Sequence, residues 1–166
     1  MKKSIYIISL IVISVVYSSC NSAASAEGTI GKHTFELLQK LDTISSASFS
    51  NHFISLEELR EFVKDTAIQD NFRNAITSLS KEKHQEGLLQ AYEMIKESGV
   101  RQQINWKDIT FKEYVFQERP DNGVTFHDGF IVFNHHTKTF MAKIVSFAYK
   151  GEQRLFILSN FEPTNH

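Results

Sequence analysis

The sequence predicts an α+β fold, in which N-terminal helices pack on a C-terminal, curved four-stranded antiparallel sheet. Two observations support this fold class. Apolar residues recur every three or four positions between residues 30 and 99, which is the spacing of amphipathic helices. After residue 99 the chain consists of segments rich in Phe, Val, Ile, Tyr and Thr that are separated by short turns, as in antiparallel strands. We therefore expect a single domain over residues 30–166.

The helical half begins with an amphipathic segment. Residues 31–43 are expected to form the first helix, because Phe35, Leu38 and Leu41 recur at three-residue spacing. Farther along, Ser55-Leu-Glu-Glu58 has the pattern of a capping box. In such a box the first and last side chains accept hydrogen bonds from each other's free backbone N–H groups, so a second helix is expected to start here.

The stretch 68–98 carries two more apolar stripes and forms either one long helix or two. Gly87 lies near the possible break, and glycine is a poor helix former. Gly99 stands just after the last apolar residue, where a glycine suits the left-handed conformation that ends many helices. We therefore expect the helical half to end at Gly99.

The second half is expected to form four strands joined by tight turns. The expected strands cover residues 109–118, 124–134, 139–149 and 154–161. Both faces of the second and third strands contain apolar residues, whereas a sheet with one face in water would alternate more cleanly. We therefore expect the second face to be covered, by a curled sheet, a partner subunit or a ligand, although a thick core without a pocket is an equal alternative.

Three features together resemble a known group of folds. They are the first helix followed by Phe49, Phe53 and the run 55–59, the link 99–109, and the closing run of long strands. This order resembles the NTF2-like and cystatin-like α+β proteins over residues 30–162. The resemblance implies a curved sheet that wraps a helix around a cone-shaped cavity. Members include enzymes, binding modules and dimerisation modules, so the fold does not assign a function.

The N-terminus has the features of a secretory signal. Lys2 and Lys3 precede the apolar run 5–17, which is too short for a comfortable membrane-spanning helix, and small residues follow it. The sequence Tyr17-Ser18-Ser19-Cys20 resembles the lipobox of bacterial lipoproteins, in the looser form seen in Bacteroidota. The resemblance implies that residues 1–19 are removed and that Cys20 is lipidated. Residues 21–29 are small and polar, so residues 20–29 are expected to form the lipidated cysteine and a flexible tether. An uncleaved anchor and a free cysteine in a secreted protein are the alternatives.

The same resemblance implies a location. Asn21 follows the cysteine in place of Asp, which disfavours retention in the inner membrane. Residues 21–27 also lack the acidic cluster that resembles a surface-export signal. We expect a protein that is lipid-anchored in the cell envelope, at the outer membrane and facing the periplasm.

Charge and cysteine content exclude several functions. The formal net charge is −1, and it becomes −3 without residues 1–19, which carry two lysines and no acidic residue. Basic residues are scattered among acidic ones, so we expect no nucleic-acid partner. One cysteine excludes an intramolecular disulfide or a multi-cysteine metal site. The seven histidines show no metal-ligand spacing, so we expect no metal and no cofactor.

One neighbouring pair of residues could carry acid–base chemistry. His127 and Asp128 are adjacent in the expected second strand, and Asp128 shares a strand face with Phe126 and Phe130. If that face lined an apolar pocket, burial would raise the pKa of Asp128 and make it a candidate base. The alternative is structural, since Asp-Gly at 128–129 also suits a bulge or turn.

Two functions follow from these observations. The first is a non-catalytic envelope lipoprotein that binds an envelope protein, a second copy of itself or a hydrophobic small ligand. Its expected ligand or interface residues are Trp106, Phe111, Phe130, Phe133, Phe147 and Tyr149. The alternative is a small NTF2-like hydrolase or isomerase that uses Asp128 with His127. A flat, exposed apolar sheet face would favour the binding module, and a pocket with Asp128 buried at its base would favour the enzyme.

Overall fold

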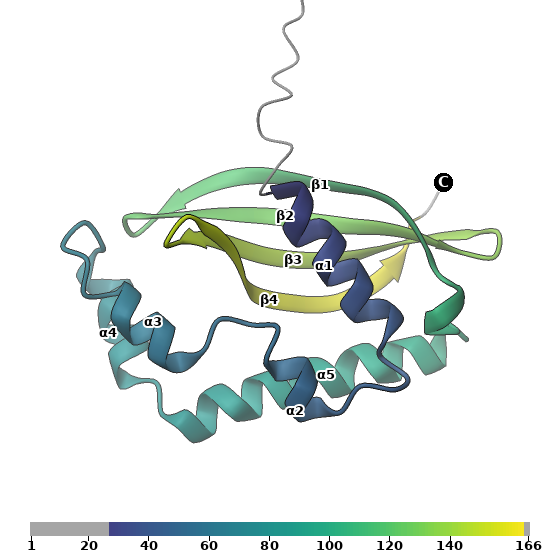
Figure 1. Ribbon diagram of the computed structural model, residues 1–166, viewed down its shortest axis with the longest axis horizontal. Coiled ribbons are helices and arrows are strands. Elements are labelled where there is room, and N and C mark those ends of the chain that lie inside the picture. The colour runs from purple at the N-terminus through teal and green to yellow at the C-terminus, as the bar shows by residue number, and fades with distance from the viewer. Residues whose placement is uncertain (1–26, 165–166) are drawn as a thin grey trace, which may run out of the picture.

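The structure, a computed structural model, describes residues 27–164, and these residues form an α+β domain with its helices N-terminal to the sheet (Figure 1). The predicted signal peptide and Cys20 lie outside the described residues. The helices are α1 (Glu27–Gln39), α2 (Ser46–Ser50), α3 (Leu56–Phe62), α4 (Asp70–Ser78), α5 (Lys81–Arg101) and the 3-10 helix η2 (Trp106–Asp108). The strands are β1 (Thr110–Asp121), β2 (Val124–His135), β3 (Lys138–Tyr149) and β4 (Glu152–Pro163).

The first two predicted helices are present, and the first is shifted. Helix α1 already begins at Glu27, within the stretch where a tether was predicted. It ends at Gln39, after which tighter turns carry Leu41 into the core. The capping box is confirmed, because the Glu58 backbone N–H donates to Ser55 Oγ at 3.1 Å and the Ser55 N–H donates to Glu58 Oε2 at 2.9 Å.

The stretch 68–98 contains two helices, but neither glycine has the predicted role. The break lies before Ser80, whose hydroxyl caps α5 by accepting from the Lys83 N–H at 3.2 Å. Gly87 lies inside α5, and the helix continues through Gly99 to Arg101. The left-handed residue after the helix is Gln103, with a φ of 55°. Gly99 is instead a contact point, since the indole ring of Trp106 packs where a side chain would be.

The strands form one antiparallel sheet in the order β1-β2-β3-β4. At the turns Asn122–Gly123 and Lys150–Gly151 both residues have positive φ, as type I′ hairpin turns require. The outer edge of β4 is covered by α5 and by the segment after α2, where the Ile54 N–H donates to the Leu155 carbonyl at 2.9 Å. The outer edge of β1 carries charged side chains, which discourage strand pairing between molecules.

Two apolar clusters hold the helices on the sheet, and they lie on opposite faces of it. In the first, α1, α5 and η2 pack on one face, with Leu37, Phe133 and Phe140 almost fully buried. Side chains of this cluster therefore fill the space where the resemblance implied a cone-shaped cavity. The second cluster lies on the other face, at the end of the sheet where α3 and α4 cover Phe126 and Phe147. Among the described residues, the members of both clusters lie between residues 30 and 161.

Candidate functional site

One face of the sheet leaves apolar side chains from all four strands partly exposed. Each strand contributes one residue, and the exposed fractions are 44% for Val115, 38% for Phe130, 36% for Met141 and 41% for Ile157. Val115 is paired with Phe130, Met141 with the buried Val132, and Ile157 with the buried Val145. We call the surface formed by Val115, Phe130, Met141 and Ile157 the open face.

The open face results from the way the helices divide the two sides of the sheet. Successive residues of a strand point to opposite faces, so Phe130 faces away from Ile131, which packs in the first cluster. Helix α1 crosses the face with Ile131 (Figure 1), and α3 and α4 cover the other face only at one end. Charged residues on neighbouring positions of the same face surround the open part: Glu113, Arg119, Asp128, Lys143 and Glu162.

A hollow of about 340 Å³ lies over this face. It is lined by Val115, Phe116, Gln117, Asp128, Phe130 and Lys143. We call it the sheet hollow. It combines apolar walls with one lysine and one carboxylate, and it is open to solvent along the sheet.

Asp128 lies in the sheet hollow but is bound to an arginine. Arg119 Nε donates to Asp128 Oδ2 at 2.6 Å, and its Nη2 donates to Oδ1 at 3.4 Å. The hydrogen bond from Arg119 lowers the pKa of Asp128 below its ordinary value; burial opposes this shift, and the charges of Arg119 and Lys143 add to it. Asp128 does share a face with Phe130, but the expected raised pKa is wrong, since the guanidinium stabilises the carboxylate. The same guanidinium lies over the ring of Phe126, at 4.9 Å from its centroid.

His127 lies on the opposite face from Asp128. It is 5% exposed, and its ring stacks on Phe116 with the centroids 4.8 Å apart. Its Nε2 lies 3.9 Å from Glu118 Oε1. Because consecutive strand residues alternate between faces, the sheet separates the two members of the predicted acid–base pair.

The six aromatic residues predicted at a pocket or interface have different roles. Trp106, Phe133 and Phe147 are at most 2% exposed and pack in the two apolar clusters. Phe111 packs edge-on against Phe35 of α1, and Tyr149 packs edge-on against Phe62 of α3. Phe130 alone among the six lies on the open face. Val115, Met141 and Ile157 were missed, although alternation along β3 already places Met141 on the same face as Val145.

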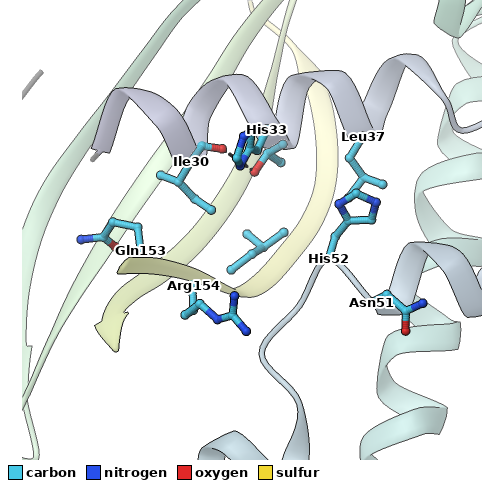
Figure 2. Close-up of a pocket in the computed structure, with 9 residues that line it drawn as sticks. Ile30, His33, Leu37, Asn51, His52, Gln153 and Arg154 are labelled. Carbon is cyan, nitrogen blue, oxygen red and sulfur yellow. Dashed lines mark hydrogen bonds between the residues drawn. The ribbon is translucent and has the colours of Figure 1, made fainter. Parts of the chain in front are cut away.

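A second cavity, of about 190 Å³, lies between α1, the turn after α2 and the start of β4 (Figure 2). It is lined by Ile30, His33, Thr34, Leu37, Asn51, His52, Gln153, Arg154 and Leu155. We call it the polar pocket. Arg154 donates a hydrogen bond from Nη2 to Glu58 Oε1, and its Nη1 lies 3.8 Å from Glu152 Oε2. No motif could have indicated this pocket, because its three segments are distant in sequence.

Among the histidines of residues 27–164, His135 has a structural role. No group of three or more His, Cys, Asp and Glu side chains in this part of the chain is arranged to hold a metal ion. His135 is buried, and its Nε2 accepts a hydrogen bond from the Asn105 backbone N–H at 3.2 Å. Burial and the neighbouring His136 lower the pKa of His135, and Asp108 opposes this in part.

Comparisons with known proteins identify no family for this chain. No family model, no curated protein and no solved structure matches the chain. Within residues 27–164 no helix is long and apolar enough to cross a membrane.

Proposed function

We propose that this chain is a lipoprotein of the bacterial cell envelope, anchored through Cys20 at the periplasmic side of the outer membrane, and that its domain is a non-catalytic binding module. The observation that carries the binding role is the open face. Apolar side chains from all four strands are exposed there on one side of the sheet. Exposed apolar surface surrounded by polar residues is typical of interaction sites.

The features of the open face favour a protein surface as its partner. An apolar centre with charged residues around it has the composition of a protein–protein interface. The sheet hollow is open along the sheet, whereas a site for a small ligand usually encloses about 70–90% of the ligand surface. A flat partner can cover Phe130 and Ile157 at once, and a free hydrophobic ligand in the hollow would leave Ile157 in water.

The enzyme alternative has less support. It needs a carboxyl group with a raised pKa next to an imidazole, but Arg119 lowers the pKa of Asp128 and His127 lies on the other side of the sheet. We expect Asp128→Asn to leave the fold and partner binding almost unchanged. An enzyme that used Asp128 as its base would lose its activity.

Site-specific photo-crosslinking in the native envelope tests the binding role. A photoreactive phenylalanine analogue replaces Phe130 or Ile157, which are exposed on the open face, and Val100 of α5 is the control because it is 79% exposed elsewhere. We expect a discrete crosslinked species from Phe130 and Ile157 but not from Val100. A species of twice the chain's own mass identifies a second copy as the partner. If neither face position gives a product that Val100 lacks, the proposed binding role is wrong.

The anchor is tested separately by Cys20→Ser. The variant cannot accept a lipid on sulfur, so we expect it to lose the incorporation of a radiolabelled fatty acid. Asn21→Ser is the matched control, because it changes the neighbouring residue and keeps the thiol. If the Cys20→Ser variant still incorporates the label, Cys20 is not the lipidated residue.

A further inference from the structure

The open face carries a positive charge near its centre. Lys143 is exposed on β3 and is paired directly with Phe130 of β2, so both side chains lie on the same face. Both also line the sheet hollow. The nearest residues of β3 on this face are Met141 and Val145, which are apolar. The ammonium group of Lys143 therefore extends from between apolar side chains, and water hydrates it while the face is uncovered.

The positive charge of Lys143 is not neutralised within the described part of the chain. The sheet hollow is lined by one acidic residue, Asp128, and Arg119 binds its carboxylate through two hydrogen bonds. Lys143 forms no ion pair with the residues that the structure describes, and its charge acts on Asp128 only at longer range. The hollow therefore combines apolar walls with one uncompensated cation.

A partner that covers the open face must replace the water around this ammonium group. Removing a charge from water is unfavourable unless an opposite charge and hydrogen bonds take the place of the water. A purely apolar partner would cover Phe130 and leave Lys143 buried without a counter-ion. A carboxylate placed against Lys143 removes this penalty, and the hollow of about 340 Å³ has room for an acidic side chain.

A second copy of this chain is a poor source of that carboxylate. In a symmetric dimer the same patch meets itself, and Lys143 lies on an inner strand, so the two copies of Lys143 would come close together. Like charges that face each other across an interface are unfavourable. The carboxylate of Asp128 is bound to Arg119, and Glu113 and Glu162 lie on the outer strands. The charges of the face therefore favour a different protein as the partner.

We propose that the partner of the open face is a different envelope protein, which places an acidic side chain flanked by apolar ones against Lys143 in the sheet hollow. Its carboxylate pairs with the ammonium group, and its apolar residues cover Phe130 and Ile157. This inference rests on the proposed binding role of the open face and adds the chemistry of the partner. The ion pair makes the interaction selective, because an apolar surface without a carboxylate would leave Lys143 unpaired.

Photo-crosslinking of the full chain in the native envelope tests the charge pairing. The photoreactive analogue replaces Ile157, which is on the open face but does not line the hollow, and Lys143 is varied in the same chain. We expect Lys143→Met, which removes the charge, to lower the yield of the crosslinked species about tenfold. Lys143→Arg keeps the charge and should retain the species. Lys138→Met is the matched control and should retain it too, because Lys138 is exposed at the start of the same strand.

A carbodiimide identifies the group that Lys143 contacts. This reagent condenses an amine and a carboxylate that touch each other into an amide with loss of water, and a guanidinium does not react. We expect a linked species in the original chain and in Lys138→Arg. We expect its loss in Lys143→Arg, although photo-crosslinking of that variant persists. Peptide mass spectrometry should show Lys143 joined to an Asp or Glu of a different protein.

The outcomes separate this inference from the binding role itself. If the analogue at Ile157 gives no crosslinked species in the original chain, the binding role is wrong and the inference fails with it. If the species forms and Lys143→Met leaves its yield unchanged, the open face binds a partner but the acidic group is refuted. A linked peptide from a second copy of this chain would overturn the choice of partner. Since Lys143 is exposed and lies outside both apolar clusters, a loss of folding does not obscure these results.

Discussion

The contact between Gly99 and Trp106 allows a stability prediction with a control in the same helix. A Cβ atom at Gly99 would lie 2.7 Å from Trp106 Cζ2 and Nε1, about 1 Å inside an ordinary contact. The indole cannot move away easily, since it is 2% exposed and packs against Phe133 and Phe161. We expect the added methyl group to destabilise the fold by about 3 kcal/mol through overpacking, at the upper end of the usual range. The higher helix propensity of alanine offsets about 1 kcal/mol of this loss. Gly99→Ala should therefore lower the free energy of unfolding by about 2 kcal/mol.

Gly87 is the control, because it lies in the same helix and a Cβ there would contact nothing within 4 Å. Gly87→Ala should raise the free energy of unfolding by about 1 kcal/mol through helix propensity alone. Urea unfolding followed by tryptophan fluorescence measures both variants, and Trp106 is the sole tryptophan, so the signal comes from the contact itself. If Gly99→Ala is as stable as Gly87→Ala, the close packing of Trp106 on α5 is refuted.

Two further predictions concern acid stability and helix capping. His135 has a lowered pKa in the folded protein and an ordinary value of 6.5 when unfolded, so its contribution to stability is present above pH 6.5 and is lost as pH falls through the folded pKa. His135→Gln keeps an acceptor for the Asn105 N–H and removes the titrating imidazole. The free energy of unfolding should therefore differ less between about pH 5 and pH 7.5 in this variant than in the original chain. An equal difference in the two proteins would contradict the role of His135. Ser55→Ala removes the hydroxyl that accepts from the Glu58 N–H. The free energy of unfolding, measured in urea, should fall by about 1 kcal/mol. No change would mean that the capping box does not stabilise α3.

Local signals in the sequence were sufficient for most elements of the fold, but not for α2, η2 or the break between α4 and α5. The change from helical to strand periodicity gave the α+β order, and the capping box gave the start of α3. Both depend on residues within about four positions of each other, so their physical effect is already present in a short segment of chain. Gly99 marks the limit of such reasoning. Its local context favours a helix end, but the packing of Trp106 requires a glycine in the middle of the last turns.

The candidate sites depended on tertiary structure. Alternation along β2 placed Asp128 and Phe130 on one face, but it could not say that α1 would cover the other face and leave Phe130 in water. The low pKa of Asp128 comes from Arg119, nine residues away along the chain and on the neighbouring strand. The polar pocket joins α1, the turn after α2 and β4, which are brought together by the burial of apolar residues in two clusters.

The sequence by itself thus determined which segments become helices and strands and which side chains share a face, since backbone periodicity and hydrogen bonds at helix ends act over a few residues. The tertiary structure decided which face of the sheet each helix covers, and with it the exposure of the open face, the ion pair of Asp128 and the lining of the polar pocket. These properties arise from contacts between distant segments, and the packing of the whole core selects those contacts.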